Sequence, residues 1–166
     1  MRAVAVFPGD RTVKVTEHPE PRIERDTDVL LEILDVGVCG TDREIARFEY
    51  GLPPPGSPYL VIGHESLAEV VEVGAAVDRV RPDDLVVVTV RRPCGRPDCP
   101  ACRVGRQDFC VTGDFTERGI KGAHGYLTER VVEEERRPRP RRHDASVGTD
   151  HDDLPVARDP VLREDG

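Results

Sequence analysis

Three side chains in the first half of the chain have the chemical types that bind a catalytic zinc ion. Cys39 ends a largely apolar run over residues 29–38, and His64 and Glu65 follow the apolar run 59–62 and a glycine. A thiolate, an imidazole and a carboxylate are the ligand types of catalytic zinc sites, which keep one coordination position open. Taken singly, a buried cysteine is typical of a core and Gly-His-Glu of a turn. The prediction of a zinc site therefore requires the three segments to meet in space.

Four further cysteines lie close together in the chain. Cys94, Cys99, Cys102 and Cys110 have the spacing C-x4-C-x2-C-x7-C, and the residues between them are rich in Gly, Pro, Arg and Asp. A segment this polar cannot form a hydrophobic core, and four thiolates around a tetrahedral zinc ion would hold it together. A closed site has no vacant coordination position, so we predict a structural zinc lobe over residues 91–111. The alternative is a loose loop with reduced, unliganded cysteines.

The elements that must position these side chains are mostly strands. Short segments of alternating or continuous apolar character are separated by turns rich in Gly, Pro and Asp, and a single short stretch, residues 41–48, has helical spacing. This pattern predicts a mainly β fold, a small barrel or sandwich. The run 85–90 is almost wholly apolar and is expected to be a buried strand. The predicted strands are residues 2–7, 12–16, 28–38, 60–62, 67–73, 85–90 and 126–132.

A glycine-rich stretch over residues 115–129 is the last candidate for chemistry. Three glycines within seven residues allow close approach of the backbone, and Glu117 and His124 flank them. Either side chain could line a cleft or lie in a solvated loop. We expect the side chains of His124, and of His18 near the start of the chain, to be solvated.

Composition limits the classes of partner. The 166 residues carry a formal net charge of −8, which argues against nucleic acid and anionic membranes as partners. No apolar run approaches membrane-spanning length. The five cysteines are odd in number and clustered, which suits metal ligation in a reducing cytoplasm better than a disulfide framework.

The order of these motifs resembles the zinc-containing medium-chain dehydrogenases. Cys-Gly-Thr-Asp at 39–42, Gly-His-Glu at 63–65 and the four-cysteine lobe follow one another as in the N-terminal, GroES-like catalytic domain of that family, over residues 1 to about 133. Further stretches look most like the archaeal glucose 1-dehydrogenases, namely residues 91–93, 105–110, 117–120 and 123–126. The resemblance implies a GroES-like, partly open β-barrel with short helices.

The resemblance also implies roles for matching positions. Cys39, His64 and Glu65 would be ligands of the catalytic zinc or positions that exchange with water, and Glu65 and Thr41 would be catalytic residues. Thr41 would hydrogen-bond the substrate hydroxyl and help to relay its proton, with Asp42 close by. Glu117 would hydrogen-bond hydroxyls of an aldose. The implied reaction is oxidation of the C1 hydroxyl to a lactone, with transfer of hydride to NAD or NADP.

The sequence departs from the family after the catalytic domain. No G-x-G-x-x-G follows a predicted strand, so we expect the nucleotide-binding Rossmann domain to be absent, activity alone to be weak or lacking, and oligomers to form only if that domain is supplied. Residues 134–166 lack hydrophobic periodicity and are predicted to be a disordered tail. The abrupt change suggests a truncated or frame-shifted gene. Two other functions stay open: a non-catalytic, zinc-stabilised binding module, and a fragment of an alcohol or polyol dehydrogenase.

Overall fold

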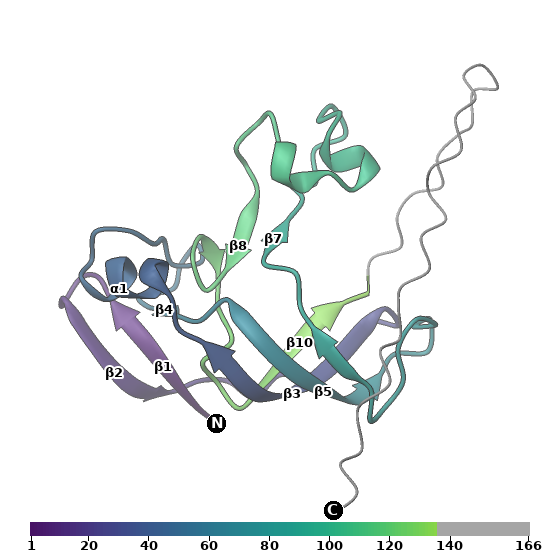
Figure 1. Ribbon diagram of the computed structural model, residues 1–166, viewed down its shortest axis with the longest axis horizontal. Helices are drawn as coiled ribbons and strands as arrows, with labels where there is room; N and C mark the ends of the chain where they lie inside the picture. Colours follow the sequence, from purple (N-terminus) through teal and green to yellow (C-terminus); the bar gives the residue numbers. More distant parts are fainter. Residues whose placement is uncertain (136–166) are drawn as a thin grey trace, which may run out of the picture.

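The computed structural model describes residues 1–135 and is mainly β, as predicted (Figure 1). Among these residues α1 (Gly40–Ala46) is the only α-helix, and two 3-10 helices, η1 (Cys102–Val104) and η2 (Gln107–Phe109), lie in the cysteine segment. The strands are β1 (Arg2–Phe7), β2 (Thr12–Glu17), β3 (Asp28–Gly37), β4 (Leu60–Val61), β5 (Glu65–Val73), β6 (Leu85–Val87), β7 (Arg91–Arg92), β8 (Thr116–Arg118), β9 (Gly122–Ala123) and β10 (Arg130–Glu134).

These strands form three small sheets. Their orders are β2-β1-β4, β10-β3-β5-β6 and β7-β8-β9, and every pairing is antiparallel except that of β8 with β9. In Figure 1, β1 and β2 lie at one end beside α1, β3, β5 and β10 form the middle, and the strands β7 and β8 lead up to the cysteine lobe. A cleft of about 1170 Å³ opens between the middle sheet and the lobe, so the barrel is partly open.

Apolar side chains from distant segments fill two main clusters. One lies on the inner face of the middle sheet, and the other lies beneath α1, where Ile45 and Leu60 are fully buried. Burial of such side chains contributes about 1.5–3 kcal/mol each. The first cluster contains Val29, Leu31, Ala68, Val70, Tyr126 and Val131. The barrel half of the molecule therefore has an apolar core of its own.

Two predicted strands differ from the structure. The run 85–90 yields only the three-residue β6, the edge strand of its sheet. Leu85 is 62% and Val87 78% exposed, because the face of β6 that carries both side chains is left uncovered. The predicted strand 126–132 begins later, at Arg130. The backbone N–H groups of Tyr126 and Leu127 donate to the carbonyls of Gly63 and Ile62 instead of pairing with a strand of the middle sheet.

The structure describes the chain up to Glu135, one residue beyond the end of β10. The predicted disordered tail over 134–166 lies, from residue 136 onward, outside the described residues, while Glu134 still belongs to β10. No helix among residues 1–135 has both the length and the apolar character needed to cross a bilayer.

Candidate functional site

Cys39, His64 and Glu65 meet at one place. One donor atom from each lies within 4.8 Å of the others. The Cys39 Sγ is 3.3 Å from His64 Nε2, and that nitrogen is 3.8 Å from Glu65 Oε1. Zinc bonds of about 2.0–2.3 Å put the donor atoms of a tetrahedral site about 3.3–3.8 Å apart. The three side chains therefore fit a zinc ion in both type and spacing.

The start of α1 orients Cys39. Cys39 is the N-cap of this helix and has extended backbone angles, φ −118° and ψ −167°. Its backbone N–H donates to Asp42 Oδ2 at 2.9 Å, and its Sγ accepts from the Thr41 N–H at 3.3 Å. Asp42 is the N3 residue, and its backbone also contacts Cys39 Sγ, so Cys39 and Asp42 form a capping box in which the sulfur replaces the usual hydroxyl. The cysteine side chain is thereby fixed before any metal arrives.

A tight turn and a buried carboxylate orient His64. Gly63 has φ +87°, and a Cβ placed on it would lie 2.9 Å from side-chain carbons of Val36 and Leu127. His64 is buried, and its Nδ1 faces Asp42 Oδ1 at 3.4 Å, with neither atom hydrogen-bonded elsewhere among the described residues. A carboxylate on the outer nitrogen of a metal-binding histidine fixes its tautomer and its orientation, which leaves Nε2 free to bind the ion.

Asp42 has a larger part in this site than the sequence indicated. One of its oxygens caps the backbone of Cys39, and the other faces His64, so a single buried side chain orients both residues. The spacing of three between Cys39 and Asp42, which is that of a capping box, is the sequence signal that could have revealed the first contact. The second contact depends on the fold.

The two predicted substrate residues come from separate segments. Thr41 is half-buried, and its backbone N–H donates to Cys39 Sγ. Glu117 is in β8, and its Oε1 accepts two bonds from the Arg91 guanidinium at 3.0 and 2.9 Å. The turn after Glu117 packs closely against Gly63, because a Cβ on Gly119 would collide with the Gly63 carbonyl. The structure thus joins the glycine-rich stretch to the segment that carries His64.

The four cysteines of the lobe also converge. Their sulfur atoms all lie within 4.8 Å of one another, and Cys99 is the one buried residue between Pro93 and Asp114. The hydrogen bond with Thr112 is the main cause that lowers the pKa of Cys110 to about 6, whereas burial raises the pKa of Cys102 to about 12. Four neighbouring thiolates repel one another, and a divalent cation offsets that repulsion. This donor set fits a closed zinc site.

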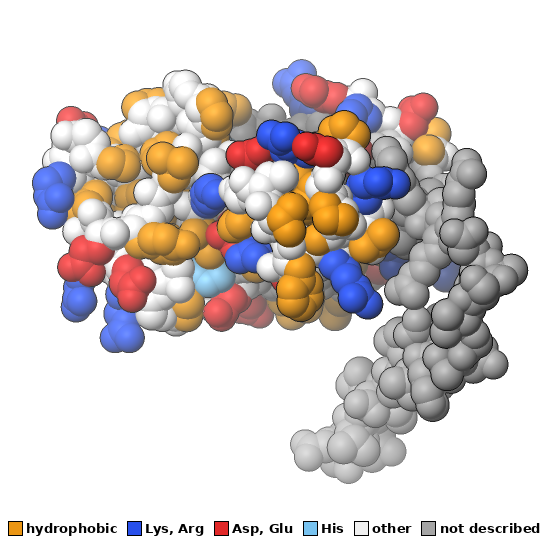
Figure 2. Space-filling view, turned by 90° about the horizontal axis from the view of Figure 1, so that it is seen from above, with side chains coloured by type: hydrophobic (Ala, Val, Ile, Leu, Met, Phe, Trp, Pro, Cys, Tyr) orange, Lys and Arg blue, Asp and Glu red, His pale blue; other side chains and the backbone are white. Residues whose placement is uncertain are grey.

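Apart from its cysteines, the lobe is held by backbone hydrogen bonds in its turns and by exposed ion pairs. Arg96 lies 2.9 Å from Asp98 and 3.4 Å from Asp114. Val104 and Phe109 are more than half exposed. On the face seen in Figure 2, hydrophobic side chains lie among interspersed basic and acidic ones.

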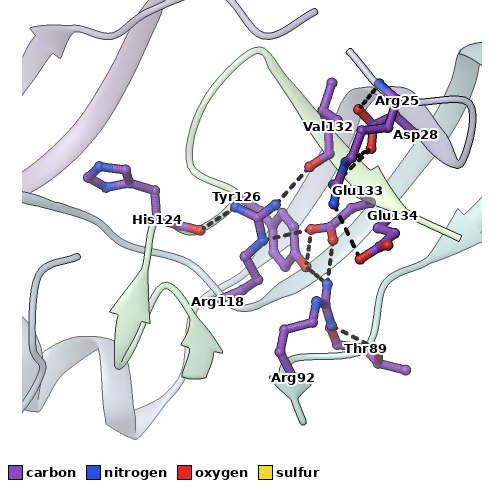
Figure 3. Close-up of polar contacts among 10 residues, drawn as sticks. All are labelled: Arg25, Asp28, Thr89, Arg92, Arg118, His124, Tyr126, Val132, Glu133 and Glu134. Carbon is purple, nitrogen blue, oxygen red and sulfur yellow. Dashed lines mark hydrogen bonds and ion pairs between the residues drawn. The ribbon is translucent and has the colours of Figure 1, made fainter. Parts of the chain in front are cut away.

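A buried ionic network joins the base of the lobe to the barrel (Figure 3). The Glu133 carboxylate lies 2.6 Å from Arg92 Nη2 in β7 and 2.7 Å from Arg118 Nε in β8. The Tyr126 hydroxyl donates to the same carboxylate at 3.1 Å, and burial together with the negative charge of Glu133 raises the pKa of Tyr126. Arg118 also donates to the carbonyls of His124 and Val132. We call these four residues, Arg92, Arg118, Tyr126 and Glu133, the joint.

His18 and His124 are half-buried in a small cluster of rings rather than fully solvated, which differs from the expectation from the sequence. The His124 ring stacks on Tyr59 at 5.1 Å and meets the edge of His18 at 4.9 Å, and its Nδ1 accepts a bond from the Val61 N–H at 3.1 Å. Burial is the main cause that lowers the pKa of His124 to about 4, with further contributions from His18 and Arg118. His124 therefore holds β4, the strand that leads to His64.

Comparison with known proteins places this geometry among the alcohol dehydrogenases. The family model of the alcohol dehydrogenase GroES-like domain matches residues 25–138. The glucose 1-dehydrogenase of Methanocella arvoryzae is 46% identical over 134 residues, which are 80% of this chain and 37% of the relative. The enzyme of the same name from Thermoproteus tenax is 48% identical over 130 residues, 78% of this chain and 35% of the relative.

Solved structures give the same result. The glucose dehydrogenase of Haloferax mediterranei in complex with NADP, Zn and gluconolactone superposes with a TM-score of 0.72 at 37% identity, over 81% of this chain and 37% of that one. Galactitol-1-phosphate dehydrogenase from Escherichia coli gives 0.66 at 26% identity, over 81% and 36%. The matched part of the chain spans little more than a third of the length of these relatives.

Proposed function

Because this chain belongs to the zinc-containing medium-chain dehydrogenases, within their alcohol dehydrogenase GroES-like domain family, we propose that residues 1–133 are the catalytic domain of an NAD(P)-linked aldose 1-dehydrogenase. The reaction would oxidise the C1 hydroxyl of an aldose to a lactone. The observation that carries the proposal is the convergence of Cys39, His64 and Glu65 within 4.8 Å of one another, in a chain whose curated relatives are named glucose 1-dehydrogenase.

In this proposal each residue at the site has a separate task. Cys39, His64 and Glu65 hold the zinc ion, which when bound supplies a Lewis acid that makes an alcohol easier to deprotonate. Asp42 keeps Nε2 of His64 directed at the ion through its contact with Nδ1. Thr41, whose backbone N–H donates to Cys39 Sγ, would accept the hydrogen bond of the substrate hydroxyl and pass its proton outward, and a bound nicotinamide would supply the hydride acceptor.

Glu117 would help to select a sugar. Both bonds from Arg91 end on Oε1, and among the described residues no contact occupies Oε2. A half-fixed carboxylate with one free oxygen is suited to accept a hydrogen bond from a sugar hydroxyl. Because its partner Arg91 holds it in place, little side-chain entropy would be lost on binding.

The cysteine lobe would have a structural role only. Cys94, Cys99, Cys102 and Cys110 would close a zinc site without a vacant position, and this would hold residues 91–111 in shape. All five cysteines are free thiols, which fits a reducing compartment such as the cytoplasm.

A metal count and a chimaera test the proposal. We expect two zinc ions per chain, one of which a chelator removes without unfolding the protein. Residues 1–133 joined to the remainder of the Methanocella arvoryzae relative should reduce NADP when glucose is added, and Cys39→Ala in the same chimaera should not. Failure of the chimaera with every aldose, together with turnover of simple alcohols or polyols, would favour the polyol alternative, to which the galactitol-1-phosphate dehydrogenase likeness points. A single, tightly held zinc ion would favour a non-catalytic module.

A further inference from the structure

His64 and Glu65 are consecutive, and this poses a geometric problem for the metal site. Side chains of neighbouring residues in a strand point to opposite faces. Glu65 is the first residue of β5 and its side chain is 55% exposed, so nothing in its own strand directs the carboxylate toward His64. Nevertheless Glu65 Oε1 lies 3.8 Å from His64 Nε2. Some neighbour must make this folded-back position possible.

The residue opposite Glu65 is Gly37, the last residue of β3. A Cβ placed on Gly37 would lie 3.1 Å from Glu65 Cβ and 3.4 Å from Glu65 Cδ, and would collide with Glu65 Oε2. Directly opposed Cβ atoms in an antiparallel pair are normally about 4.5–5.5 Å apart. The carboxylate of Glu65 therefore occupies the space that the side chain of any other residue at position 37 would fill.

An irregularity in β3 brings the glycine to this position. Ile33 pairs with Ala68, but Asp35 pairs with Leu67, so Leu34 is an extra residue without a partner in the ladder. Without this bulge the register would place Val36, and not Gly37, opposite Glu65. Bulges next to functional sites re-aim side chains in this way. The shift and the glycine act together, since neither alone would clear the space.

From these contacts we propose that Gly37 is a positioning residue of the zinc site, and that it acts by letting the Glu65 carboxylate fold back beside His64. The inference rests on the proposed function, because it assumes that Glu65 serves the bound ion. Gly37 does not have a left-handed φ, so its backbone would accept alanine. The Glu65 side chain is 55% exposed, so its carboxylate has room to turn away. The 3.1 Å contact with Glu65 Cβ needs a shift of only a few tenths of an ångström in the paired strands, so alanine would displace the carboxylate and leave the fold intact.

The test compares metal affinity in four variants of the full chain. Zinc affinity at the Cys39 and His64 site is measured by competition with a chromophoric chelator, and the geometry is followed by the visible spectrum of Co²⁺. Gly37→Ala should weaken binding about 10-fold or more, the usual effect of losing an outer support. Glu65→Gln should weaken it at least as much, and the double variant should be no weaker than Glu65→Gln within about 2-fold, because both changes remove one interaction.

Gly40→Ala is the matched control. Gly40 lies in the same segment as Gly37, directly after Cys39. A Cβ placed on Gly40 would have open space around it, with Arg43 Nη2 at 4.0 Å. This variant should keep the zinc affinity and the Co²⁺ spectrum of the wild type. A loss equal to that of Gly37→Ala would mean that the site tolerates no change in this segment, and would overturn the proposal.

The remaining outcomes separate this inference from the proposed function. If the wild type binds no ion at this site, the proposed function fails. If Glu65→Gln weakens binding and Gly37→Ala does not, or if the two effects add in the double variant, the role of Gly37 is wrong while the proposed function stands. Unfolding of Gly37→Ala, seen as loss of the lobe zinc and a lower melting temperature, would also overturn the inference, since only the carboxylate and a small adjustment of the two paired residues are expected.

Discussion

The two groups of metal-type ligands are built on opposite principles. The lobe draws four thiols from one short stretch, residues 94–110, and Cys99 is its one buried residue. The other site draws its ligands from segments on either side of the apolar cluster beneath α1, and His64 and its neighbour Asp42 are buried there. A segment without a core depends on its metal to fold. A site in a packed barrel can fold before it binds its metal, and the predictions below test this difference.

The largest effect is expected from Cys99→Ser. Loss of one thiolate opens the lobe site, and structural zinc supplies about 10 kcal/mol of folding free energy in comparable small sites. We expect the variant to lose the lobe zinc and residues 91–111 to become sensitive to proteases, while the barrel stays folded. Zinc analysis and limited proteolysis measure this. An intact, protease-resistant lobe without zinc would end the contrast between the two regions.

The next effect is expected at the joint. Glu133→Gln removes the negative charge between Arg92 and Arg118 and leaves two half-buried guanidinium groups without a counter-charge. Breaking a buried ion pair in this way lowers the free energy of unfolding by about 3 kcal/mol. Urea unfolding measures this loss. The control is Glu129→Gln, since the pair of Glu129 with Arg2 is exposed and its loss should cost less than about 1 kcal/mol. Equal costs would show that the joint stabilises the fold no more than an exposed ion pair does.

Substitution of Cys39 should separate metal binding from stability. Cys39→Ala removes a zinc ligand and the N-cap of α1, so the free energy of unfolding should fall by about 1 kcal/mol. Cys39→Ser keeps an atom that can cap the helix, so its stability should stay near that of the wild type while zinc affinity still drops. Chelator competition and thermal melts provide the two readouts. Loss of the lobe zinc in either variant would contradict the independence of the two regions.

The smallest effect concerns pH. In the folded chain burial holds the pKa of His124 at about 4, whereas an unfolded histidine titrates near 6.5. Between these values the unfolded state binds more protons, so stability is complete above pH 6.5, falls as the pH drops through this window and levels off below pH 4. Since the ring is half-exposed, solvent screening reduces the loss to about 1 kcal/mol.

His124→Asn isolates this contribution. Its side-chain oxygen can accept the bond that the Val61 N–H donates to His124 Nδ1, and it has no proton to gain in this range. Urea unfolding at pH 7 and pH 5 should show a smaller loss for the variant than for the wild type. If His124→Asn showed the same pH dependence as the wild type, a group other than His124 would be responsible for it.

Local patterns in the sequence predicted much of the fold. The strand over residues 2–7 is in place, and the helix predicted over 41–48 is found at Gly40–Ala46, because alternation, turn residues and capping act over a few neighbouring positions. The edge position of β6 was not predictable in this way. Its apolar run reads the same whether one face or both are covered, and only the packing of the folded chain leaves the face of Leu85 and Val87 uncovered.

For the sites, the sequence by itself determined which atoms are available. It indicated four thiols close enough along the chain to share an ion, and an imidazole and a carboxylate side by side at 64 and 65. Tertiary structure alone decided that Asp42 faces His64, that His124 binds the backbone of Val61, and that a bulge at Leu34 brings Gly37 against Glu65. The reason is physical: ligand type and spacing are local properties, whereas strand register is set by the packing of the whole barrel, and one residue of slip exchanges every neighbour.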